Sequence, residues 1–130
     1  MLPLLTSANG QHFLAHLPRK VTTPFIAAEL AVAKTRPVSP QTMQEVEELA
    51  IAVRHRRMSC NNEVLTPGVT SLAAPVFDHR GELACTIALV GGAGGLDLAW
   101  DGVPARMLAA AARRFSERLG APDAMLDAAS

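Results

Sequence analysis

Apolar residues recur at helical spacing in the first part of the chain and at alternate positions further on. Three segments with helical spacing predict helices at about residues 7–17, 25–33 and 40–57. Each predicted helix begins at a residue type that caps helices: Ser7 or Asn9, Thr22-Thr23-Pro24, and Ser39-Pro40. In the second and third, a proline follows at the first helical position.

After residue 57 the pattern changes to that of β-strands. Residues 59–64, 69–77 and 82–90 are predicted strands, because apolar and β-branched residues gather there between turn-forming residues. The links Thr66-Pro67-Gly68 and Asp78-His79-Arg80-Gly81 have typical turn compositions. Strands joined by such short links pair antiparallel, since a parallel pair needs a longer crossover.

A last helix is predicted at about residues 102–119, ended by Gly120. Its apolar positions share one expected buried face: Leu108, Ala111, Ala112, Phe115 and Leu119. Residues 121–130 are expected to be a frayed tail. The order of helices, antiparallel meander and helix predicts an α+β fold, an antiparallel β-sheet flanked by helices.

The two faces of the third predicted strand differ in side-chain size. One face carries residues that suit a packed interior: Leu83, Cys85, Ile87 and Leu89. The other carries mostly small residues: Ala84, Thr86, Ala88 and Val90. Ser71 and Ala73 of the second strand also share a face. Either a close-packed helix or a bound ligand would fill the space above such a small face.

Composition narrows the function classes. A chain of 130 residues fits one domain, and 12 basic residues balance 12 acidic ones. This zero net charge argues against direct contact with nucleic acid, and an aromatic content of 4% argues against base stacking. No apolar run is long enough to span a membrane, and no signal peptide is recognisable. Cys60 and Cys85 are therefore expected to be reduced thiols in the cytoplasm.

Candidate chemistry is sparse, and no catalytic residue is predicted. Gly91–Gly95 is expected to end the third strand as a flexible loop, since it lacks the spacing of a phosphate loop. His12 and His16 have the spacing of a metal pair on one helix face, but no further ligand accompanies them. Cys60 lies near cationic residues that lower a thiol pKa. The basic run 54–57 is either a solvated helix end or a phosphate site. Neither a metal nor a cofactor is expected.

Several segments together resemble the effector-binding domain of IclR-type transcriptional regulators. The likeness covers about residues 3–120, and the stretch Ala73-Ala74-Pro75-Val76-Phe77-Asp78 followed by Gly81 is its most specific part. Weaker similarities occur in the order expected for that family: 7–15, 53–58, Asn62-Glu63, Gly68-Val69 and 115–120. The resemblance implies a GAF-like domain of a homodimeric or tetrameric cytoplasmic regulator that binds a small organic acid.

The family's pocket positions fall here on six residues: Ala8, Asn9, Asn61, Ser71, Ala88 and Val90. Sensors of small acids carry an acidic residue at the position of Asn61 and hydroxyls at those of Ala88 and Val90. The resemblance therefore implies an effector less polar than a two-carbon acid. Backbone N–H groups of Ala8, Asn9 and Gly10, at a helix start, are expected to bind its carboxylate.

The resemblance also implies that 1–120 is a partial domain, lacking the winged helix-turn-helix and the opening strands and helix of the family. An uncovered sheet edge would follow, so self-association is expected. Two alternatives remain beside the effector-binding domain. The chain would serve as an oligomerisation module with a vestigial pocket, or as a small enzyme using Cys60 or a histidine.

Overall fold

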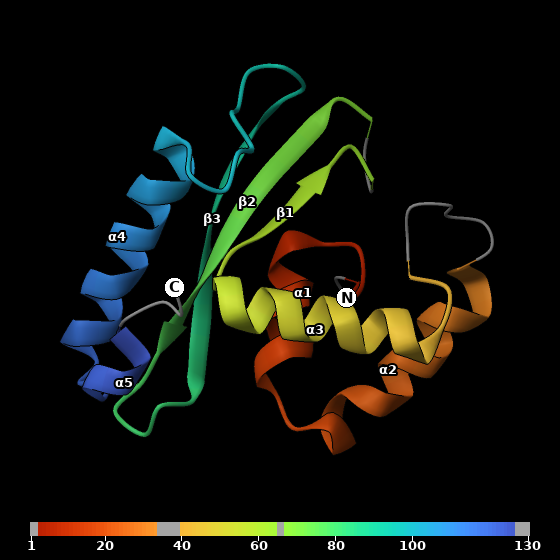
Figure 1. Cartoon of the computed structure of the whole chain (residues 1–130), viewed down its shortest axis with the longest axis horizontal. Helices are drawn as coiled ribbons and strands as arrows, with labels where there is room; N and C mark the ends of the chain where they lie inside the picture. The colour runs from red at the N-terminus through yellow and green to blue at the C-terminus, as the bar shows by residue number, and fades with distance from the viewer. Residues whose placement is uncertain (1–2, 34–39, 65–66, 127–130) are drawn as a thin grey trace.

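The computed structural model describes residues 3–33, 40–64 and 67–126 (Figure 1). Its helices and strands follow one another in this order: α1 Ala8–His16, α2 Arg19–Val32, α3 Met43–Arg56, β1 Ser59–Asn62, β2 Val69–Phe77, β3 Leu83–Gly92, α4 Val103–Arg118 and α5 Asp123–Leu126. The strands form one antiparallel sheet in the order β1-β2-β3. The predicted α+β class and antiparallel meander are confirmed.

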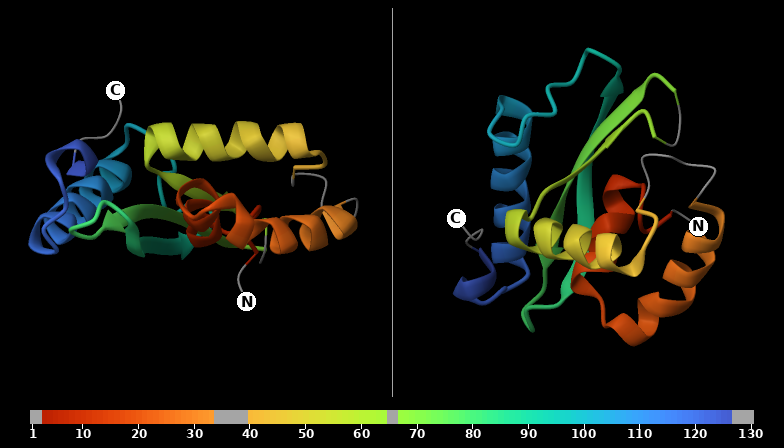
Figure 2. Two further views of the ribbon diagram at one scale, coloured as in Figure 1. Left: turned by 90° about the horizontal axis from the view of Figure 1, so that it is seen from below. Right: turned by 45° about the vertical axis from the view of Figure 1, so that its right-hand side comes forward.

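The sheet separates two groups of helices. Helix α4 lies on one side of it, and α1, α2 and α3 lie on the other (Figures 1 and 2). Between the sheet and α4 an apolar cluster includes Leu72, Val76 and Leu108. A second apolar cluster, among α1, α2 and α3, includes Leu14 and Val46. None of the helices in the described part of the chain is long and apolar enough to cross a bilayer.

The first helix begins as predicted, and the second does not. Ser7 caps α1, its hydroxyl accepting a hydrogen bond from the Gly10 N–H. Helix α2 begins at Arg19, so Pro24 lies inside the helix instead of at its start. Thr22 and Ile26 are the buried residues of α2, and their spacing of one turn requires helix on both sides of Pro24. Burial of this face outweighs the backbone hydrogen bond that proline removes.

Helix α3 begins later than predicted, at Met43 with Thr42 as its cap. The Thr42 hydroxyl accepts from the Glu45 N–H at 3.2 Å, and the Glu45 carboxylate accepts from the Gln41 N–H at 2.8 Å. These two hydrogen bonds satisfy two backbone N–H groups at the start of the helix. A proline at the first position satisfies neither, so the capping pair determines where α3 begins. The predicted cap Ser39 lies outside the described residues.

The strands differ from prediction at their ends. Strand β1 stops at Asn62 because Glu63 adopts a left-handed conformation with φ of 60°. Strand β3 continues through Gly91 and Gly92, which pair with Thr70 and Val69. The expected break at Gly91 is wrong, since glycine in a ladder weakens pairing without preventing it.

The interior predicted for β3 is only partly formed. Ile87 is half-buried against the α4 cluster, but Cys85 and Leu89 are exposed. Strand β3 lies at one edge of the sheet that the described residues form. Both cysteines are free thiols, as predicted.

Helix α4 buries Leu108 and Ala112, as predicted, but the rest of its buried face differs from the prediction. Its buried residues are small or medium in size: Ala105, Leu108, Ala112 and Ser116. Ser116 belongs to this face because its hydroxyl accepts from the Phe77 N–H of β2 at 3.0 Å. Phe115 and Leu119, predicted to be buried, are exposed by 51% and 45%. The helix ends at Arg118, and Gly120, with φ of 80°, follows its C-cap as the predicted terminator. In the expected tail, residues 123–126 form α5.

Candidate functional site

Helix α1 is tied across the small-residue face of the sheet by one hydrogen bond to each strand. The three bonds are Ser59 Oγ to the Ala8 carbonyl, His12 Nε2 to the Ala73 carbonyl at 2.8 Å, and Thr86 Oγ1 to Asn9 Oδ1 at 2.8 Å. The small face predicted either a close-packed helix or a bound ligand above it. Around Ala73 the close-packed helix α1 fills this space.

The strand register brings together the predicted site residues beyond the start of α1. Asn61 of β1 lies opposite Ser71 of β2, and Ser71 lies opposite Val90 of β3. Ala88 shares the face of Val90, because side chains two residues apart point to the same side of a strand. Asn61, Ser71 and Val90 form one row across the sheet, from polar to apolar side chains. Ala88 lies in the neighbouring row, closer to α1.

The N-terminal end of α1 faces this row. The helix runs from Ala8, near Ser59, to His16, whose ring contacts Phe77 edge-on at 5.1 Å. It therefore runs away from Asn61, with the positive end of its dipole toward the Asn61–Ser71–Val90 row. The N–H groups of Ala8 and Asn9 donate to no described acceptor. The Gly10 N–H, expected to bind ligand, is instead taken by Ser7 Oγ at 2.8 Å.

The six positions differ in exposure. Ala8 and Asn61 are buried, Asn9 and Ser71 are half-buried, and Ala88 and Val90 are exposed. Asn61 Oδ1 accepts from the Val64 N–H at 2.9 Å, which leaves the amide nitrogen of Asn61 as a donor. The arrangement offers hydrogen-bond donors at one end and small apolar side chains at the other. It is open on the β3 side.

The two histidines are committed to packing. His12 is fully buried, and burial lowers its pKa from 6.5 to about 4. Its Nε2–H donates to a carbonyl and is unavailable to a metal. His16 stacks on His12 at 5.8 Å, and burial lowers its pKa to about 4 as well. Within the described residues no group of three metal-ligating side chains is assembled.

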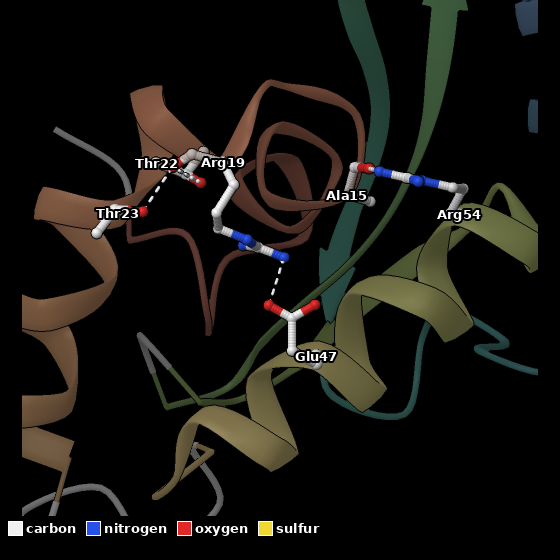
Figure 3. A network of polar contacts seen from close by, with 6 residues as sticks. All are labelled: Ala15, Arg19, Thr22, Thr23, Glu47 and Arg54. Carbon is white, nitrogen blue, oxygen red and sulfur yellow. Dashed lines mark hydrogen bonds and ion pairs between the residues drawn. The ribbon is translucent and has the colours of Figure 1, made fainter.

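The thiol and the basic run also have structural roles. Burial raises the pKa of the Cys60 thiol although Arg56 opposes the shift, so the nearby cations do not activate this thiol. Arg56 stacks on Trp100 at 3.7 Å. Arg54 caps the C-terminal end of α1 by donating to the Ala15 carbonyl (Figure 3). Of the two interpretations of the basic run, these contacts favour the helix end.

The structure also contains a hollow that the sequence does not indicate. A hollow of about 450 Å³ lies between α1, α3 and the start of β3, lined by His16, Leu17, Pro18, Arg19, Arg54, Glu82 and Leu83. Arg19 pairs with Glu47 at 2.8 Å beside it (Figure 3). No local pattern marks this hollow, because its walls come from segments far apart in the sequence. Neither it nor two smaller hollows of about 40 and 150 Å³ include any of the six predicted residues.

Comparison with known proteins identifies the family. The family model described as "Bacterial transcriptional regulator IclR C-terminal" matches residues 1–117. The crystal structure of HmgR from Pseudomonas aeruginosa superimposes with a TM-score of 0.82 at 33% identity, over 95% of this chain and 47% of that one. For IclR of Thermotoga maritima the TM-score is 0.71 at 22% identity, over 90% and 47% of the two chains.

A third solved structure is a complex. It contains a double mutant of the inducer-binding domain of the PobR transcription factor from Acinetobacter with 3-hydroxybenzoic acid. Its TM-score is 0.66 at 19% identity, over 88% of this chain and 66% of that one. No curated protein sequence matches significantly. The chain spans about half the length of HmgR and of the Thermotoga IclR. By its match over residues 1–117 and its fold, the chain belongs to the IclR family of bacterial transcriptional regulators, within their C-terminal effector-binding domain.

Proposed function

We propose that the chain senses a small organic acid, which binds between the first turn of α1 and the Asn61–Ser71–Val90 row. One observation carries the proposal. The N–H groups of Ala8 and Asn9, which donate to no acceptor in the described part of the chain, lie at the positive end of α1, toward side chains that offer further donors. A carboxylate accepts hydrogen bonds from such a set of donors, and the helix dipole favours its charge.

The apolar end of the row sets the expected chemistry of the rest of the ligand. Ala88 and Val90 offer neither charge nor hydroxyl, so the group next to the carboxylate is apolar and larger than that of a two-carbon acid. The PobR relative, solved with 3-hydroxybenzoic acid, supports an aromatic acid as the first class to test. The chain acts as a cytoplasmic sensor without catalysis of its own. In the whole regulator, ligand changes the association of these domains and thereby DNA binding by another segment.

Thermal melting with a short ligand series tests the site. Benzoate and 3-hydroxybenzoate should raise the melting temperature, because ligand at about 100 times its Kd adds about 2.7 kcal/mol to the folded state. Benzamide lacks the charge, and acetate lacks the apolar body, so both should stabilise the protein much less. A series in which no acid stabilises the protein refutes the proposed function.

Paired variants test the location. Asn61→Leu and Ser71→Leu should each abolish the stabilisation by benzoate. Asn62→Leu is the matched control, since Asn62 follows Asn61 but is exposed on the opposite face of β1. A response that survives both site variants would place the ligand elsewhere, with the 450 Å³ hollow beside Arg19 the next site to examine.

A second function, self-association, is favoured by a separate observation. Strand β3 is paired along one side only, and its outer side has no described partner. An oligomerisation module with a vestigial pocket would need this edge and would show no response to any acid.

A further inference from the structure

The side-chain amides of both asparagines in the candidate site are held the same way round. Thr86 of β3 donates its hydroxyl hydrogen to Asn9 Oδ1, in the first turn of α1, at 2.8 Å. The Val64 N–H donates to Asn61 Oδ1 at 2.9 Å. An amide oxygen only accepts and an amide nitrogen only donates. With both oxygens occupied, the two side chains are left with their Nδ2 groups as donors.

Both of these Nδ2 groups are available to a ligand. Neither donates to an acceptor in the described part of the chain, and neither is among its buried, unpaired polar atoms. Each therefore reaches solvent, although Asn61 is exposed by only 8%. The candidate site thus offers N–H donors from two side chains and from the first turn of α1, and none of its six residues offers an unoccupied amide or carboxylate oxygen.

The main chain on either side of Asn9 is fixed by other hydrogen bonds. Ser59 Oγ donates to the carbonyl of the preceding residue, and the N–H of the following residue donates to Ser7 Oγ at 2.8 Å. The Thr86 hydroxyl is therefore not needed to place the helix. It determines which way the Asn9 amide turns, since the oxygen and nitrogen of an amide exchange places by a half-turn about the last side-chain bond.

The two amides are too far apart for one carboxylate to bind both. Asn61 lies on β1, whereas Thr86 holds the Asn9 amide beside β3, at the opposite edge of the sheet. Neighbouring strands are about 4.8 Å apart, so β1 and β3 are about 10 Å apart. The two oxygens of a carboxylate share one carbon atom and do not span that distance. A ligand that uses both amides therefore needs acceptors at both ends.

We propose that Thr86 is a positioning residue that sets the ligand class of this site, and that the effector is an acid with a second, acceptor-only oxygen, such as a keto group or a second carboxylate. The proposal rests on the proposed function. The first carboxylate binds over β1, at the Ala8 N–H and the Asn61 amide. The apolar body lies over Ala88, and the second oxygen accepts from Asn9 Nδ2. A far end that carries only donors would leave this Nδ2 unpaired.

The negative charge of the acid favours the same orientation of the Asn9 amide. If Oδ1 were turned toward the ligand, the negative end of the amide dipole would face an anion. Because Thr86 holds this oxygen, the positive end faces the ligand before it binds. An amide that is already oriented loses less conformational freedom on binding, so the Thr86 hydroxyl also raises the affinity.

Calorimetric titration with a matched pair of acids tests the role of Thr86. 3-Acetylbenzoate and 3-isopropylbenzoate have nearly the same shape, but only the first carries a carbonyl oxygen. Wild type should bind 3-acetylbenzoate about three- to tenfold more tightly, the effect of one net hydrogen bond. Thr86→Val should lose most of this preference, because turning Nδ2 to the ligand would leave Asn9 Oδ1 against a methyl group without a donor. Thr86→Ser restores the hydroxyl and should keep the wild-type ratio.

Two further variants complete the titrations. Asn9→Ala removes the amide and should bind the two acids with equal affinity, which gives a second measurement that does not depend on the folding of Thr86→Val. Thr70→Val is the matched control. The Thr70 hydroxyl donates to the Gly91 carbonyl at 3.2 Å, on the face of β2 opposite to Ser71, so this variant should keep the wild-type ratio.

The outcomes separate the role of Thr86 from the proposed function. Equal affinity of wild type for the two acids overturns the proposal for Thr86, as does a preference that survives in both Thr86→Val and Asn9→Ala or that Thr86→Ser does not retain. In each of these cases, binding of benzoate leaves the sensor function standing. If neither benzoate nor either of the matched acids binds, the sensor function is refuted, and the proposal for Thr86 with it.

Discussion

Acidification should destabilise the protein through His12, and the size of the effect follows from its burial. The folded state holds the pKa of His12 at about 4, whereas an unfolded chain has 6.5. Between these values the unfolded state binds a proton that the folded state does not, so stability falls with falling pH. At about pH 5 the difference covers about 1.5 pH units, and at 1.36 kcal/mol per unit the loss is about 2 kcal/mol.

Urea unfolding of wild type and His12→Gln, at about pH 7.5 and about pH 5, isolates this contribution. Glutamine keeps an N–H donor for the Ala73 carbonyl but does not titrate. The variant should lose about 2 kcal/mol less than wild type on acidification. His55→Gln, at an exposed position of α3, is the matched control and should keep the wild-type pH dependence. Equal losses in wild type and His12→Gln would refute the reasoning.

Three further substitutions test contacts that hold α1 in place. Gly10→Ala should destabilise the protein by about 1–3 kcal/mol in urea unfolding, because the new Cβ would lie 2.0 Å from the Pro3 carbonyl oxygen; a gain, as in an ordinary helix, would contradict the close approach. Ser59→Ala should cost about 1 kcal/mol by removing the buried hydrogen bond to the Ala8 carbonyl, which keeps only its helical donor, and a neutral result in the same assay would exclude a contribution from that bond. Arg54→Met keeps the side-chain stem but not the donors to Ala15, and should lower the melting temperature more than Arg114→Met on the exposed flank of α4.

The sequence predicted the elements whose signals are local. The three strands and their antiparallel order follow from short turns, and Ser7 and Gly120 are ends that single residues determine. The starts of α2 and α3 differ from the prediction because a proline does not determine them. Burial of Thr22 and Ile26 extends α2 in front of Pro24, and the Thr42–Glu45 capping pair sets the start of α3. In both cases contacts several residues away determine where the helix begins.

The candidate site was predicted as a set of residues, and its geometry was not. The family resemblance named positions on α1 and all three strands, and the register does bring the strand positions onto one face. No sequence pattern shows that Ser7 occupies the Gly10 N–H, or that Asn61 uses its oxygen on Val64. Such assignments depend on distances between backbone atoms, which residue types alone do not determine.

The buried face of α4 shows what periodicity alone cannot determine. Periodicity predicted that Phe115 and Leu119 are buried, yet in the single chain they are exposed beside Met107. A pattern of apolar residues at intervals of four indicates a face that packs against another element, whether or not that element belongs to the same copy. Leu89 and Val90 on the adjacent strand show the same conflict between apolar character and exposure.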